Sequence, residues 1–143
     1  MELLYYISNG LYRRRVPVLP RCLMLLIRLL YQSFVPYQTI IGPGVSFGHR
    51  QGIVIARTAR IGARCLIRHQ VTIANTVTGA AIIGDDVQIG AGAKIIGNVT
   101  IGNRARIGAN AVVLDDVPAD VTVAGIPARV VKRHVADGRD DGL

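Results

Sequence analysis

A six-residue repeat is the feature of this sequence that most constrains its fold. Five consecutive blocks cover residues 83–112: IGDDVQ, IGAGAK, IIGNVT, IGNRAR and IGANAV. Each block opens with Ile, its second residue is Gly except at Ile96, and its fifth residue is Val or Ala. Further blocks of the same kind reach back to Ile41. One hexapeptide cannot bury its apolar face alone, so such repeats stack and share a core.

The repeat predicts an all-β chain folded as a parallel β-helix. Each hexapeptide supplies one short strand, and coils stack about 4.8 Å apart. The opening Ile and the small fifth residue point inward, and we expect Gly at the second position to permit a tight turn. Cys65 occupies a fifth position. It is therefore predicted to be a small core residue and not a reactive thiol.

The period is broken at two places. Phe47–Val54, which contains FGHRQG, has eight residues where six are expected, and Ile73–Ile82 has ten. Insertions in solenoids become loops on one face, often the functional face. If three blocks make one coil, one edge carries His49, His69, Ala91 and Ala109. A long, thin ligand could then lie along the alanines with its reactive end at the histidines, although isolated histidines in turns are often inert.

The first 40 residues do not share the repeat and are predicted to form a short helical segment. The run Arg21–Val35 is mostly apolar but too short to span a membrane. It lacks the small-residue cleavage site that a signal peptide would have, so a signal peptide is not expected. We expect a helix that packs on the body or on a neighbouring chain. The alternative is a helix in the membrane interface, with Arg13–Arg15 against anionic lipid. The predicted organisation is a helical segment 1–40, a β-helix domain 41–132 and a polar tail 133–143.

The formal charge of +8 comes mostly from 15 arginines. Such a surface attracts phosphates, nucleic acid, an anionic membrane or an acidic cofactor. No recognition motif or aromatic platform supports nucleic-acid binding. Cys22 and Cys65 show neither disulfide nor metal spacing, which favours a reducing, cytoplasmic setting.

Five segments carry a family resemblance: FGHRQGIVI, VTIAN, IGAGAKIIGNVTIG, IGANAVVLDDVP and AGIPARVVK. With them, residues 41–132 resemble the hexapeptide-repeat acyltransferases, whose fold is a left-handed β-helix. The resemblance is to their serine acetyltransferase-like branch, which includes O-acetyltransferases of exopolysaccharide and colanic-acid gene clusters. It implies acetyl-CoA as the acyl donor and a homotrimer with active sites between subunits.

The resemblance also implies roles for individual residues. His49 matches the general base that removes a proton from the acceptor hydroxyl, and His69 is a candidate second catalytic residue. The CoA-binding residues that it suggests are Ala91, Gly92, Ala109, Arg129 and Lys132. Arg129 and Lys132 would meet the phosphates, unless they are only solvated charges. No metal site is expected, because a zinc carbonic anhydrase of this fold needs three histidine ligands and the third histidine, His134, lies in the tail.

The acceptor is predicted from what is missing. Serine acetyltransferases carry an upstream aspartate, which would fall near Phe34, and a charged loop with a second histidine. Here Glu2 is the only acidic residue before Asp85, and the loop 73–82 has no charge. We therefore expect a neutral saccharide hydroxyl, on a polysaccharide or its lipid-linked precursor at the inner face of the membrane. The alternatives are a serine O-acetyltransferase of cysteine biosynthesis and a non-catalytic scaffold.

Overall fold

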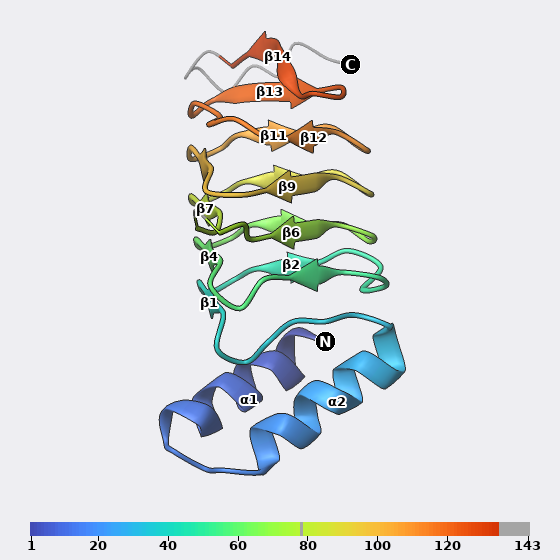
Figure 1. The fold of residues 1–143 in the computed structure, drawn as a ribbon, viewed down its shortest axis with the longest axis vertical. Coiled ribbons are helices and arrows are strands. Elements are labelled where there is room, and N and C mark those ends of the chain that lie inside the picture. Colours follow the sequence, from blue (N-terminus) through green and yellow to red (C-terminus); the bar gives the residue numbers. More distant parts are fainter. Residues whose placement is uncertain (78, 135–143) are drawn as a thin grey trace.

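The structure, a computed structural model, describes residues 1–77 and 79–134 and consists of a triangular β-prism with two helices at one end (Figure 1). Consecutive short strands belong to three different sheets, so three strands make one coil. All strand pairs within the prism are parallel; the exception is β13 with β14 at the far end. The predicted β-helix of hexapeptide repeats is therefore confirmed, with about four complete coils.

The three walls of the prism contain the following strands. The first wall stacks β1 (Ile40–Ile41), β4 (Arg60–Ile61), β7 (Ile82–Ile83) and β10 (Thr100–Ile101). The second stacks β2 (Ser46–Phe47), β5 (Leu66–Ile67), β8 (Gln88–Ile89), β11 (Arg106–Ile107), β13 (Val121–Ala124) and β14 (Arg129–Arg133). The third stacks β3 (Val54–Ile55), β6 (Thr72–Ala74), β9 (Lys94–Ile96) and β12 (Val112–Val113).

The core is a set of stacked aliphatic columns. Except in the first block, where Ile41 is partly buried, the first and fifth residues of a regular block are buried, as Ile89 and Ala93 are at 1% and 0% exposure. Cys65 is buried in the same way, and its thiol donates a hydrogen bond to Gly84 O. The prediction that Cys65 is a small core residue is confirmed. Burial raises the pKa of its thiol, which disfavours the reactive thiolate.

The glycines at the second position have a different function from the one predicted. They do not adopt the left-handed backbone that a tight turn would need. Instead, a Cβ on Gly42 would lie 2.6 Å from Gly62 C, and one on Gly90 would lie 2.6 Å from Ala109 N. Glycine is required there because adjacent coils approach too closely for a side chain.

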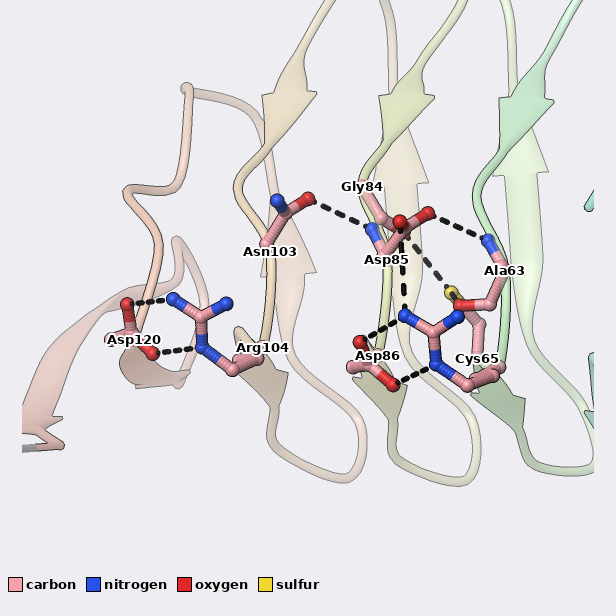
Figure 2. A network of polar contacts seen from close by, with 9 residues as sticks. Ala63, Cys65, Gly84, Asp85, Asp86, Asn103, Arg104 and Asp120 are labelled. Atoms are coloured by element: carbon pink, nitrogen blue, oxygen red, sulfur yellow. Dashed lines mark hydrogen bonds and ion pairs between the residues drawn. The ribbon is translucent and has the colours of Figure 1, made fainter. Parts of the chain in front are cut away.

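The left-handed residues occupy the fourth position instead, and along one edge they form a ladder of ion pairs. Arg64, Asp86, Arg104 and Asp120 all have φ near +57° to within two degrees. Two bidentate pairs result, Arg64 with Asp86 and Arg104 with Asp120, and Figure 2 labels the second pair. Asp85 accepts a hydrogen bond from Ala63 N–H and Asn103 accepts one from Asp85 N–H. These hydrogen bonds and ion pairs join the turns of neighbouring coils, so this edge has a structural role.

The helices α1 (Glu2–Arg13) and α2 (Leu19–Tyr31) cover the N-terminal end of the prism (Figure 1). Tyr5 and Tyr6 of α1 donate hydrogen bonds to Thr39 O and Gly42 O, which join α1 to the first coil. Helix α2 packs inward through Ile27. The predicted packing on the body is thus observed, within a pair of helices.

Helix α2 ends earlier than the predicted helical run Arg21–Val35. Gln32 adopts a left-handed conformation at φ +50°, which terminates the helix. The next residues are extended, and Phe34 pairs with Val54 on the third wall. No helix among the described residues is long and apolar enough to cross a membrane. Arg133 still belongs to β14, and the rest of the predicted tail after His134 lies outside the described residues.

Candidate functional site

The first break in the repeat is an insertion of two residues, His49 and Arg50. Gly48 N–H donates to Ile67 O and Gln70 N–H donates to Gln51 O, so only His49 and Arg50 lack a counterpart in the next coil. Both have left-handed backbones, at φ +60° and +53°. Two such non-glycine residues in succession are strained, and strain of this kind concentrates at functional sites.

The predicted edge is present, with one difference. His69, Ala91 and Ala109 stack in register, because Phe47, Ile67, Ile89 and Ile107 pair in succession. The residue that precedes them in the column is Gln51, because the insertion displaces His49 from the third position. The side chain of His49 nevertheless lies beside this column, because its ring contacts that of His69.

His49 and His69 are in direct contact. Their ring centroids lie 5.3 Å apart and the rings meet edge to face. His49 is exposed, whereas His69 is half-buried and its Nδ1 has no hydrogen-bond partner among the described residues. A buried polar atom without a partner costs free energy, so a ligand or another subunit is expected to supply one.

The helical end of the molecule holds the His49 loop in place. The buried Ser33 hydroxyl, just after α2, lies 2.9 Å from Arg50 O and accepts a hydrogen bond from Ile53 N–H at 3.0 Å. Glu2 of α1 accepts a hydrogen bond from Phe47 N–H at 3.0 Å and pairs with Arg50 Nε at 3.2 Å. Burial alone would raise the pKa of Glu2, but the hydrogen bond from Phe47 N–H contributes to a net lowering of that pKa. Glu2 therefore stays ionised beside the loop.

A surface pocket opens beside His49. Its volume is about 420 Å³, and its lining residues are Leu30, Tyr31, Phe47, His49, Arg50 and Gln51. The Arg50 side chain is 49% exposed, so its guanidinium can meet a ligand while Nε pairs with Glu2. The pocket thus combines a candidate base, a cation and an apolar wall from α2.

A second hollow of about 290 Å³ lies farther along the same column. Ala91 and Ala109 line it together with two arginines, Arg68 and Arg106. Because alanine side chains are short, a ligand in this groove can lie close to the backbone. Gly92 is not among its lining residues; its backbone is left-handed, and a Cβ at this position would clash with Asn110 Oδ1. Its predicted role in CoA binding stays a prediction.

The two basic residues predicted near CoA lie on β14. Arg129 pairs with Ala124, one coil beyond Ala109, and its side chain contacts Asp115. Lys132 is opposite Thr122, farther from the column. The backbone of Arg129 thus lies one coil beyond the column, with its guanidinium on Asp115, and the roles of both residues stay predictions. Among residues 1–77 and 79–134, no cluster of His, Cys, Asp and Glu could hold a metal ion.

Sequence reasoning missed several residues of this site. Arg68 had a signal, because it stands at a second position where most blocks have Gly. Arg50 and Gln51 lie within FGHRQG, but the repeat pattern predicted no function for them. Glu2 and Ser33 had no local signal, since their contacts with the loop join residues 45 and 17 positions apart.

Comparison with known proteins defines the class first. Residues 80–115 match the family model described as Bacterial transferase hexapeptide (six repeats). Together with the prism, this match shows a hexapeptide-repeat fold that is similar to the bacterial transferases of this model.

The particular branch follows from three relatives. Serine acetyltransferase of Synechococcus elongatus is 43% identical over 131 residues, which cover 89% of this chain and 54% of that protein. Serine acetyltransferase of Staphylococcus xylosus is 38% identical, with 96% and 64% covered. The structure of serine acetyltransferase from Brucella abortus in complex with Coenzyme A superposes with a TM-score of 0.87 at 31% identity, covering 93% and 55%. The predicted resemblance to the serine acetyltransferase-like branch is confirmed, and the chain spans about half to two thirds of these relatives' length.

The predicted saccharide acceptor is wrong, because these relatives are serine acetyltransferases. That prediction relied on an apparent lack of charged groups to bind an amino acid. The structure places two charged groups at the insertion that this reasoning did not count: Arg50, which lines the pocket, and Glu2, which pairs with Arg50. The relatives support the predicted enzyme class, an O-acetyltransferase.

Proposed function

We propose that this chain transfers an acetyl group from acetyl-CoA to the hydroxyl of serine. The observation that carries the proposal is the pocket in which His49, in contact with His69, lies beside the Arg50 guanidinium. An imidazole is a suitable general base near neutral pH, and a guanidinium is the group that best binds a carboxylate. The serine relatives support the same acceptor.

The chemistry requires one proton transfer and one acyl transfer. His49 takes the proton of the serine Oγ–H, and Oγ attacks the thioester carbonyl to form a tetrahedral oxyanion. Collapse of this species breaks the C–S bond, and the CoA thiolate recovers the proton from the His49 imidazolium. His69 supports the reacting end through its contact with His49.

Acetyl-CoA is proposed to lie along the column beyond the histidines. Ala91 and Ala109 let the pantetheine arm approach the backbone, while Arg68 and Arg106 provide positive charge in the same hollow. Arg129 stands at the far end of the column and is proposed to meet the phosphates, with Lys132 beyond it. A Coenzyme A complex of a Brucella abortus relative supports a CoA site in this fold.

The active assembly is proposed to be a homotrimer. The buried His69 Nδ1 has no partner among the described residues of one chain, and the His49 pocket is open at the surface. A neighbouring subunit would close this site. Light scattering should then report the mass of three chains. The predicted cytoplasmic location stays a prediction.

The proposal is tested by measuring CoA release from acetyl-CoA with serine and with serinamide, which keeps the hydroxyl and the ammonium group but lacks the carboxylate. Wild type should turn over serine with a clear preference over serinamide. His49→Ala should lower kcat by about a hundredfold or more without loss of the folded assembly. Arg50→Gln should raise KM for serine roughly tenfold to a hundredfold, leave KM for acetyl-CoA unchanged and reduce the preference over serinamide.

Arg57→Gln is the matched control, since Arg57 is an exposed arginine that lines a different pocket. Its kinetics should equal those of wild type. No release of CoA with serine would contradict the proposed acceptor. An active Arg50→Gln enzyme with unchanged KM for serine would contradict only the proposed binding of the serine carboxylate by Arg50.

A further inference from the structure

The outward face of α2 is apolar and has no partner among the described residues. Ile27 is buried against the body, but Leu25, Leu29 and Leu30 are 54%, 71% and 61% exposed. At about 100° per residue, Leu25 and Leu29 lie opposite Ile27, and Leu30 lies on the flank between Leu29 and Ile27. The full set on this outward face is Leu19, Cys22, Leu25, Leu26, Leu29 and Leu30. Patches of this kind mark interaction surfaces.

Arginines border this face. Arg21 and Arg28 lie seven positions apart on α2, so they share a flank of the helix, and both are exposed. Arg13 ends α1, Arg14 and Arg15 begin the connection to α2, and all three are exposed as well. Ten arginines and one carboxylate, Glu2, precede Asp85, and Glu2 is already paired with Arg50. From Asp85 onward, seven cations accompany eight carboxylates, so the positive charge is concentrated in the part of the chain that contains the helices.

We propose that the outward face of α2 lies on an anionic lipid surface. The leucines would enter the boundary of the acyl chains, and the flanking arginines would meet lipid phosphates, as in interfacial amphipathic helices. A second copy is the other way to cover the face. A contact between this face and the same region of a neighbouring copy in the proposed trimer would bring arginines of both copies together. The one carboxylate of this region, Glu2, is already paired with Arg50, so such a contact opposes association.

The placement has a consequence for the site. Leu30 belongs to the outward face and also lines the His49 pocket. The lipid surface would then lie next to the wall of the pocket that Leu30 forms. The membrane contact does not depend on which acceptor the enzyme uses.

The test is co-sedimentation of the full chain with vesicles of phosphatidylcholine alone and with vesicles of phosphatidylcholine and phosphatidylglycerol at about three to one. Binding to the anionic vesicles should be at least about tenfold stronger and should weaken as salt is added. Leu25→Gln/Leu29→Gln should reduce that binding about tenfold or more, and Arg21→Gln/Arg28→Gln should reduce it by a similar factor. Leu114→Gln/Val131→Gln is the control, because both side chains are exposed apolar residues near the opposite end of the prism.

Circular dichroism and thermal unfolding of each variant should match wild type, which separates lost binding from lost fold. Equal binding to both vesicle types, or none, would overturn the proposal. So would a smaller assembly of Leu25→Gln/Leu29→Gln in light scattering together with no vesicle binding by wild type, because the face would then be a subunit interface.

Discussion

Ser33 connects the end of α2 to the loop that carries His49, through a hydroxyl with 1% exposure. We predict that Ser33→Ala leaves Ile53 N–H and Arg50 O without this partner, at a cost of about 1–3 kcal/mol in the free energy of unfolding. The two left-handed residues of the loop would then relax, and kcat should fall about tenfold while KM for acetyl-CoA changes little. Thermal unfolding and CoA-release kinetics measure the two effects.

The control for this variant is Ser46→Ala, which removes an exposed hydroxyl from β2. Its stability should stay within about 0.5 kcal/mol of wild type. A Ser33→Ala enzyme with full activity would show that the hydroxyl does not position the His49 loop.

At the scale of single coils, the close approach of adjacent coils at the second-position glycines predicts that Gly→Ala lowers stability there. The same substitution in a helix should not. In Gly42→Ala the new Cβ would lie 2.6–2.7 Å from backbone atoms of the next coil, which cannot move without disturbing the stack. We expect the free energy of unfolding to fall by about 2 kcal/mol or more, as for overpacked cores. Chemical denaturation monitored by circular dichroism measures this loss.

Gly10→Ala provides the matched comparison. Gly10 lies within α1, and a Cβ there would meet nothing within 4 Å. Alanine is favoured over glycine in a helix, so stability should rise by about 0.5–1 kcal/mol. Two variants of equal stability would contradict the explanation from coil spacing.

For the whole molecule, the ion-pair ladder predicts how stability depends on pH. The hydrogen bonds from Arg64 and Arg104 lower the pKa values of Asp86 and Asp120. Because these pKa values are lower in the folded state, the stabilisation is complete above the ordinary aspartate pKa and is lost as pH falls from about 5 to about 2. The pairs are exposed, so the effect should be small and weaker in about 1 M salt.

Asp86→Asn/Asp120→Asn should therefore flatten part of the fall in thermal midpoint over this acid range. The same measurement in salt is the control, because screening should reduce the difference between the variant and wild type. A variant with the same pH profile as wild type would show that the ladder does not contribute.

The parts of the structure that could be predicted are those that the repeat determines. A hexapeptide period places Ile67, Ile89 and Ile107 one above another, so the column of His69, Ala91 and Ala109 could be derived by counting. Counting failed at the insertion, where two extra residues gave the third position to Gln51. It also had no means of finding Glu2, whose contact with the loop comes from the docking of α1. The acceptor prediction counted missing charges and left out Arg50, whose place in the pocket counting could not give.

The regular stacking of the coils also has a consequence for evolution and design. A column on one edge can change length only by whole coils, about 4.8 Å at a time. Three added hexapeptides between His69 and Ala109 would move Arg129 one step farther from the histidines and leave the chemistry at the N-terminal end untouched. The number of coils therefore sets how long a molecule must be to reach both ends of this edge.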